Sequence, residues 1–209
     1  MKIKSLSALF ILSLMVWSFN LANCSAPEAE SSETKSDKME ESSPTVYENF
    51  TLKDYNGKEH SLSDYKDSKA IVVIFIATQC PVSNAYNERM VQLYKDYQPK
   101  DIAFVGINSN KQEDAEEVKK HSEEHNFEFP VLKDWDNVIA DRFEASVTPE
   151  IYVLNSEFQE LYHGRIDDSQ REGNVKSQDL RAALDAILAG KTVPIIETKA
   201  FGCSIKRVR

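Results

Sequence analysis

The stretch Ala70-Ile-Val-Val-Ile-Phe-Ile-Ala77-Thr-Gln-Cys80-Pro81 decides the fold of this 209-residue chain. Its first part, residues 70–77, is continuously apolar and rich in β-branched side chains, which predicts a central strand covered on both faces. After Pro81, residues 82–97 place aromatic and apolar side chains three and four positions apart, which predicts one amphipathic helix. Because proline suits the first turn of a helix, Cys80 is expected at a strand-to-helix junction.

The flanking segments extend this strand and helix into an α/β order. Residues 50–52 and 60–62 surround the dipeptide Asn56-Gly57, a strong hairpin signal, so a β-hairpin is expected to open the domain. Further strands are expected at residues 102–107, 129–132, 151–154 and 160–165, and further helices at 112–125, 136–143 and 178–189. This order predicts an α/β protein with a thioredoxin-like fold, in which helices flank a mixed central sheet and a β-hairpin forms an N-terminal extension.

The N-terminus has the pattern of a secretory signal peptide over residues 1–23. Lys2 and Lys4 precede an apolar run at residues 6–19, which is too short for a comfortable membrane span. The sequence Leu21-Ala-Asn-Cys24 resembles a bacterial lipobox, in which the cysteine becomes the lipidated first residue of the mature chain. We therefore expect an exported protein of the periplasm or outer cell envelope, attached to the membrane by a lipid on Cys24. Cleavage near Ala26 without lipidation is the open alternative.

Residues 24–45 are predicted to be a disordered linker. The segment is rich in serine and acidic residues and contains too few apolar side chains to bury a core. The folded domain is then expected at residues 46–209. The chain has 25 basic and 34 acidic residues, for a net charge of -9, so non-specific nucleic-acid binding is not expected.

Several dispersed motifs point to one family. Phe75-Ile-Ala77-Thr-Gln-Cys80-Pro-Val-Ser83 is similar to the thioredoxin pattern F-x-A-x-x-C-x-x-C, and Val147-Thr148-Pro149 is similar to the segment that carries a cis-proline opposite the thiol. Further matching motifs are Cys80–Tyr86, Gly106–Asn110, His163–Asp168, Asp179–Leu184 and Phe201–Lys206. Over residues 49–207 the chain thus resembles the peroxiredoxin-like redoxins of the alkyl hydroperoxide reductase and thiol-specific antioxidant family. The resemblance implies a nucleophilic Cys80, a cis-Pro149 preceded by Thr148 that contacts a bound substrate chain, and no cofactor or metal.

The expected position of Cys80 suits a reactive thiol. The nucleophile is the thiolate, and the free N–H groups and dipole of a helix N-terminus lower the cost of its charge. The alternative is a buried, inert cysteine, because free cysteine is among the most buried residue types.

Three positions near Cys80 depart from related families. Ser83 occupies the place of the second thioredoxin cysteine, and a C-x-x-S site cannot resolve a mixed disulfide within the motif. Peroxiredoxins carry a proline and a peroxide-orienting hydroxyl where this chain has Val73 and Ala77. Ala77 is also the position of the first cysteine in redoxins whose C-x-x-C motif ends at this thiol. We therefore expect neither a local dithiol nor an efficient peroxidase.

Two residues farther along the chain are candidate members of the site. Cys203 is a candidate resolving cysteine that would form a disulfide with Cys80, within the chain or across a dimer. The sequence does not specify the distance between them, and Cys203 as a bystander thiol is the alternative. Arg165 would lower the pKa of the thiol or bind an anion, or it is a solvated residue at the end of a strand.

The sequence His121-Ser-Glu-Glu124-His125 matches the inverted zinc-protease pattern H-x-x-E-H. Residues 112–125 are charged nearly all round, so we expect this helix to lie on the surface with its histidines in solvent.

The sequence therefore predicts an exported thiol-based oxidoreductase in which Cys80 takes part in thiol-disulfide exchange or peroxide reduction. Its expected partners are a disulfide-bearing protein or a peroxide, together with an external thiol reductant. The alternative is a non-catalytic thioredoxin-like binding module of the cell envelope, which the missing local dithiol favours.

Overall fold

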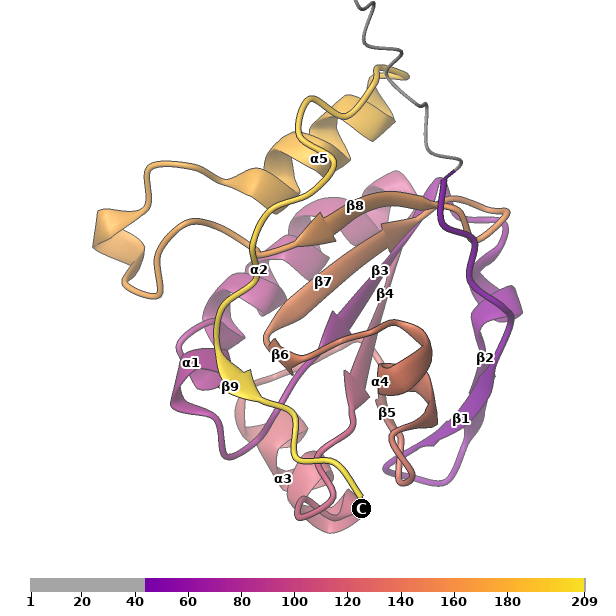
Figure 1. Cartoon of the computed structure of the whole chain (residues 1–209), viewed down its shortest axis with the longest axis vertical. Coiled ribbons are helices and arrows are strands. Elements are labelled where there is room, and N and C mark those ends of the chain that lie inside the picture. The colour runs from indigo at the N-terminus through magenta and orange to yellow at the C-terminus, as the bar shows by residue number, and fades with distance from the viewer. Residues whose placement is uncertain (1–43, 209) are drawn as a thin grey trace, which may run out of the picture. The chain divides into compact units, whose positions relative to one another are not determined.

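The computed structural model describes residues 44–208, and these form a mixed sheet flanked by helices, as predicted (Figure 1). The strands are β1 Thr51–Asp54, β2 Glu59–Ser61, β3 Ala70–Phe75, β4 Ile102–Asn108, β5 Val131–Lys133, β6 Val147–Thr148, β7 Glu150–Leu154, β8 Glu160–Gly164 and β9 Cys203–Ser204. The α-helices are α1 Pro81–Asn84, α2 Asn87–Tyr97, α3 Ala115–Glu124, α4 Val138–Arg142 and α5 Asp179–Leu188. The main sheet has the order β2-β1-β5-β4-β3-β7-β8, and β6 pairs with β9 in a second sheet.

The predicted signal peptide, Cys24 and nearly all of the predicted linker lie outside the described residues. Between residues 44 and 208, none of the helices has the length and apolar character needed to cross a membrane.

Strand β3 is the centre of the main sheet. It runs parallel to β4 and antiparallel to β7, and every one of its residues is buried. Because side chains alternate along a strand, Val72 and Ile74 join one hydrophobic core while Ile71 and Val73 join the other. Helices α2, α3 and α5 contribute to the first core, and α4 contributes to the second. Burial on both faces explains the continuous apolar run of this strand.

The predicted N-terminal hairpin forms from β1 and β2. Thr51 lies opposite Ser61, and the N–H of Gly57 donates to the carbonyl of Asp54 at 3.0 Å. Gly57 has a φ of 83°, a conformation that glycine adopts without steric cost. Strand β1 also pairs with β5, so the hairpin extends one edge of the main sheet.

The helix after Cys80 differs from the prediction of one helix over residues 82–97. The chain forms α1 and α2, separated at Ala85 and Tyr86. The N–H of Tyr86 donates to the carbonyl of Ser83 at 2.9 Å, and the carbonyl of Ala85 accepts from the Arg89 guanidinium at 3.1 Å. A side chain that binds helix carbonyls interrupts the regular ladder at this point. The predicted inner face still forms, from Tyr86, Met90, Leu93 and Tyr97.

Helix α3 has a buried face, so the prediction of histidines in solvent is wrong for His121. This residue is 8% exposed, and its ring packs against the edge of Phe127 with a centroid distance of 5.8 Å. Burial lowers the pKa of His121 to about 4, and the neighbouring His125 acts in the same direction. The buried face of α3 consists of Val118, His121 and Ser122. The many charged residues of this segment made that face difficult to recognise from the sequence.

The C-terminal segment forms a pairing that the sequence did not predict. Figure 1 shows it passing from α5 alongside β8 to β6 and α1. Strand β9 runs antiparallel to β6, with Ser204 opposite Val147 and Cys203 opposite Thr148. This arrangement brings the end of the chain to the carboxyl end of β3.

Candidate redox site

Cys80 lies at the strand-to-helix junction, as expected, and is the N-cap residue of α1. Its sulfur accepts a hydrogen bond from the backbone N–H of Ser83 at 3.3 Å, and Pro81 occupies the first turn of the helix. The residue is only 4% exposed. A backbone N–H directed at the sulfur favours the thiolate once the sulfur is reduced.

The structure joins Cys80 to Cys203 in a disulfide that spans 123 positions of the sequence. The two Cα atoms are 5.9 Å apart, which is a usual separation for a disulfide. Cys203 reaches this position because β9 pairs with β6 and lies opposite Thr148. The predicted nucleophile and the predicted resolving cysteine are therefore in direct contact within one chain.

Gly202 makes the approach of β9 to β6 possible. A Cβ atom at this position would lie 2.0 Å from the carbonyl oxygen of Thr148, much closer than any real contact. A side chain here would push the C-terminal segment away from β6. The close approach to Thr148 therefore explains why position 202 is a glycine, and this requirement was not visible in the sequence.

The peptide bond between Thr148 and Pro149 is cis, in agreement with the family resemblance. The carbonyl oxygen of Thr148 lies 3.4 Å from the sulfur of Cys80. Thr148 is 2% exposed, and its hydroxyl has no hydrogen-bond partner within residues 44–208. Thr148, Pro149 and the two cysteines thus form one cluster, here called the disulfide site.

Ser83 ties the end of β3 to the start of α1. Its side chain is completely buried, and its hydroxyl oxygen accepts a hydrogen bond from the N–H of Ala77 at 3.3 Å. Its own backbone N–H points at the sulfur of Cys80. The residue at the position of the second thioredoxin cysteine therefore supports the loop that carries Cys80.

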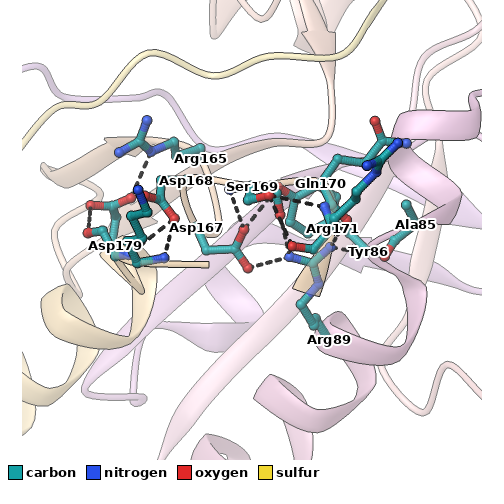
Figure 2. Close-up of polar contacts among 12 residues, drawn as sticks. Ala85, Tyr86, Arg89, Arg165, Asp167, Asp168, Ser169, Gln170, Arg171 and Asp179 are labelled. Atoms are coloured by element: carbon teal, nitrogen blue, oxygen red, sulfur yellow. Dashed lines mark hydrogen bonds and ion pairs between the residues drawn. The ribbon is translucent and has the colours of Figure 1, made fainter. Parts of the chain in front are cut away.

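Arg165 follows β8 directly and pairs with a carboxylate on α5. Its Nε donates to Asp179 at 2.7 Å, as Figure 2 shows, and the hydroxyl of Ser177 also donates to Asp179 at 2.6 Å. Among residues 44–208, no hydrogen bond or ion pair joins Arg165 to Cys80 or Cys203. The arrangement favours a role in holding α5, which differs from both roles at the thiol that the sequence suggested.

A second ionic contact holds the segment after β8 against α2. Asp167 is 3% exposed, accepts from Arg89 at 2.5 Å and accepts from the hydroxyl of Tyr86 at 3.0 Å (Figure 2). Arg89 also donates to the carbonyl of Gln170 at 2.6 Å, and the Gln170 side chain donates to the carbonyl of Pro81 at 3.4 Å. The segment after β8 is therefore bound to α2 through Arg89 and to the first residue of α1 through Gln170.

Sequence reasoning missed the carboxylate that supports the loop before Cys80. Glu113 is 1% exposed and accepts hydrogen bonds from the N–H groups of Thr78 at 2.9 Å and Gln79 at 3.1 Å. It also accepts from the side-chain amides of Asn108 and Asn110. The motif Gly106–Asn110, used only as a family resemblance, was the available signal.

Sequence reasoning also missed the pair formed by Glu150, which directly follows the cis-proline, and His163 on β8. Glu150 accepts from the N–H groups of Ser146 at 2.7 Å and Val147 at 3.1 Å, and from Nε2 of His163 at 2.8 Å. Burial would raise the pKa of Glu150, but these hydrogen bonds outweigh it and lower the pKa. Burial would lower the pKa of His163, but the hydrogen bond and charge of Glu150 raise it. The pair thus favours its ionised form and fixes the loop before β6.

The comparisons with known proteins agree with this geometry. The family model described as AhpC/TSA family matches residues 45–162, more than half of the chain. The chain belongs to the AhpC/TSA family. This confirms the redoxin class that the motifs predicted.

Individual relatives add detail. The thiol-disulfide oxidoreductase ResA of Bacillus subtilis (strain 168) is 29% identical over 109 residues, which cover 52% of this chain and 59% of ResA. A hypothetical protein of Sinorhizobium meliloti 1021 has a solved structure that matches with a TM-score of 0.74 and 35% identity, covering 79% of this chain and 94% of that chain.

The thioredoxin domain of a thiol-disulfide oxidoreductase from Bacteroides vulgatus matches with a TM-score of 0.50 and 21% identity, over 56% of this chain and 84% of that chain. At this identity the likeness shows the fold alone, and it confirms the thioredoxin-like class. ResA is named as a thiol-disulfide oxidoreductase, which supports the expected class of enzyme. The match spans less than two thirds of the length of ResA.

Proposed function

We propose that this chain is an exported thiol-based oxidoreductase in which Cys80 is the nucleophile and Cys203 is the resolving cysteine. The single observation that carries this proposal is the disulfide between these residues, formed beside the cis-peptide bond of Pro149. Neither Ser83 nor Ala77 supplies a local second thiol. A cysteine on β9 therefore takes the place of the partner that a C-x-x-C motif would contain.

The reaction that fits this arrangement has two exchange steps. The Cys80 thiolate attacks a substrate disulfide, forms a mixed disulfide and expels one substrate sulfur as a thiolate, which takes up a proton. The Cys203 thiolate then attacks the sulfur of Cys80, forms the intramolecular disulfide and releases the second substrate thiol. The substrate gains two electrons, and an external thiol reductant later returns two electrons to the chain.

We infer a disulfide-bearing protein as the substrate, in preference to a peroxide. The relative ResA is named as a thiol-disulfide oxidoreductase, and this supports exchange chemistry. Val73 and Ala77 stand where a peroxidase of this family type would have its proline and its peroxide-orienting hydroxyl. With a peroxide, Cys80 would form a sulfenic acid and Cys203 would condense with it to release water; we expect this route to be slow.

The test is mass spectrometry of the reduced protein after reaction with either a model peptide disulfide or stoichiometric hydrogen peroxide. Wild-type protein should reach the Cys80–Cys203 disulfide with the peptide at least ~100-fold faster than with peroxide. Cys203→Ser should stop at a peptide adduct on Cys80, and Cys80→Ser should form no adduct. A faster reaction with peroxide would reverse the substrate assignment. A wild-type protein that forms no adduct and no disulfide would favour the non-catalytic binding module.

Export and lipid attachment are part of the same proposal and rest on the sequence of residues 1–26. A signal peptide followed by Cys24 supports a protein anchored by lipid in the cell envelope. Detergent fractionation of cells that express the full chain tests this. The wild-type protein should enter the detergent phase, and Cys24→Ala should move the protein to the aqueous phase. Equal partition of the two would overturn the lipid anchor.

A further inference from the structure

The side chain of Asn110 connects the C-terminal segment that carries Cys203 to Glu113, a carboxylate that binds the loop before Cys80. Its Oδ1 accepts a hydrogen bond from the backbone N–H of Lys206 at 2.7 Å. Its Nδ2 donates to the carboxylate of Glu113 at 3.0 Å. Lys206 is three residues beyond Cys203, and Asn110 itself is 4% exposed. One buried amide therefore joins the C-terminal segment to a carboxylate in the interior.

The carboxylate of Glu113 continues this connection to the other cysteine. It accepts from the N–H groups of Thr78 and Gln79, the two residues before Cys80. Both of its oxygens are used, because Oε2 accepts from Thr78 and Oε1 accepts from Gln79 and Asn110. The position of the Cys80 loop is thereby tied to the position of Asn110.

A buried lysine binds the main-chain carbonyl of the same residue, Asn110. Nζ of Lys133 donates to the carbonyl of Asn110 at 2.7 Å and to Oδ1 of Asn108 at 2.8 Å. Lys133 is 2% exposed, and this burial lowers its pKa to about 8. The N–H of Lys111 also donates to the carbonyl of Lys206 at 2.9 Å, which adds a second bond between this part of the fold and the C-terminal segment.

We propose that Asn110 and Glu113 are positioning residues that place Cys203 against Cys80 and thereby set how readily the disulfide forms. Neither side chain contacts a sulfur in the hydrogen bonds described above, so both act through the backbone of the two segments that carry the cysteines. The inference rests on the proposed function, because it concerns the step in which Cys203 resolves Cys80. It goes further by assigning the pairing of the two cysteines to a polar network outside the disulfide site.

The quantity that this network controls is the effective concentration of one thiol at the other. Two protein thiols and oxidised dithiothreitol exchange two electrons and two protons to give the protein disulfide and reduced dithiothreitol. If Cys203 is held less well, the equilibrium moves towards the protein dithiol. We expect at least a ~10-fold loss of disulfide stability, which for this two-electron couple corresponds to about 30 mV.

The decisive variant changes the backbone of the C-terminal segment at Lys206. Lys206→Pro removes the N–H that reaches Asn110 and leaves both buried side chains in place, while Lys206→Ala keeps the N–H and is the matched control. The Lys206 side chain is exposed, so both variants should fold. Asn110→Ala and Glu113→Gln break the same connection from the interior. Asn155→Ala, at the β7–β8 turn with a similar number of hydrogen bonds, controls for the loss of an asparagine.

The measurement is redox titration against dithiothreitol of the full-length protein, followed by thiol labelling and mass spectrometry, with thermal unfolding measured alongside. The inference predicts that Lys206→Pro, Asn110→Ala and Glu113→Gln weaken the disulfide at least ~10-fold, whereas Lys206→Ala and Asn155→Ala match the wild type. In a glutathione buffer, the first three should accumulate a glutathione adduct on Cys80. If Asn110→Ala fails to fold, Lys206→Pro decides.

Two results would overturn the inference in distinguishable ways. A wild-type disulfide that titrates reversibly, together with Lys206→Pro that titrates like Lys206→Ala, rejects the positioning role and leaves the proposed function intact. A wild-type protein that forms no intramolecular disulfide rejects both.

Discussion

The two segments that meet at the disulfide are held in opposite ways. Cys80 is 4% exposed and follows β3, a strand whose residues are all buried between two hydrophobic cores. Cys203 is half-buried on β9, a strand of only two residues that pairs with another of two residues. The first segment is positioned by a fully buried strand, and the second by a two-residue strand, the buried amide of Asn110 and one core side chain, that of Ile205.

This difference indicates which part of the site moves when the disulfide opens. Releasing the Cys80 loop would expose several core residues of the central sheet, whereas releasing β9 separates a two-residue pairing and exposes one core side chain, that of Ile205. A substrate chain that paired with β6 at the edge β9 occupies would have to displace β9. We therefore expect the C-terminal segment, and not the Cys80 loop, to give way during each cycle.

The largest effect should come from the cysteines themselves. Cys80→Ser should abolish reaction with a disulfide substrate, because within residues 44–208 the sulfur of Cys80 is the one that accepts a backbone N–H of the helix. Cys203→Ser should keep the first step within ~3-fold of wild type but stop at the mixed disulfide. Stopped-flow mixing with a peptide disulfide, followed by mass spectrometry, separates the two steps. Equal loss of the first step in both variants would remove the functional difference between the two segments.

The next effect should come from Gly202. A Cβ at this position would lie 2.0 Å from the carbonyl of Thr148, so Gly202→Ala should displace β9 and slow disulfide formation by at least ~10-fold. Global stability should fall by only about 1 kcal/mol, because the displaced strand is short and lies at the surface. Gly173→Ala is the control, since no atom lies within 4 Å of the added Cβ. A loss of stability without a change in the rate would show that β9 is part of the structural core.

The same contrast explains what the sequence predicted and what it did not. The apolar run of β3, Pro81 and the spacing of Met90 and Leu93 are local patterns, so the main sheet and the place of Cys80 were predicted correctly. The pairing of β9 with β6 joins residues far apart in sequence, and two-residue strands have no periodicity to detect. The distance between Cys80 and Cys203 therefore could not be predicted from the sequence.

The sequence also failed to predict which polar residues are buried inside the fold. Glu113 and His121 lie in a segment whose composition is highly charged, and their burial depends on contacts with distant backbone groups and rings. The break at Ala85 likewise depends on an arginine side chain that binds a helix carbonyl. Composition and period report the average environment of a segment, and they miss single polar groups that turn inward.

A smaller effect, on stability and its pH dependence, should come from the pair behind the cis-proline. The raised pKa of His163 means that its stabilisation is complete below its unfolded value of 6.5 and is lost as pH rises through the folded value. The lowered pKa of Glu150 means that its stabilisation is present above 4.5 and is lost as pH falls through the folded value. His163→Gln should therefore cost most between these two values, by about 2 kcal/mol.

Urea unfolding at a series of pH values measures this effect on the His163 variant and the wild type. The difference in unfolding free energy should narrow as pH rises from 6 to 9, because the wild-type imidazolium loses its proton. A difference that does not change with pH would mean that His163 acts by packing on Tyr152, whose ring it stacks at a centroid distance of 4.3 Å.

The smallest effect on chemistry should come from Arg165, which the sequence suggested as a partner of the thiol. Its guanidinium is bound to Asp179 on α5. Arg165→Gln should therefore change the rate of Cys80 alkylation by less than ~2-fold at every pH, because it leaves the field at the sulfur nearly unchanged. It should lower the unfolding free energy by about 1 kcal/mol, since Asp179 keeps its bond from Ser177 but loses a charged partner. A shift of the alkylation profile to higher pH would instead assign Arg165 to the site, and the comparison between the Cys80 and Cys203 segments would then have to include the end of β8.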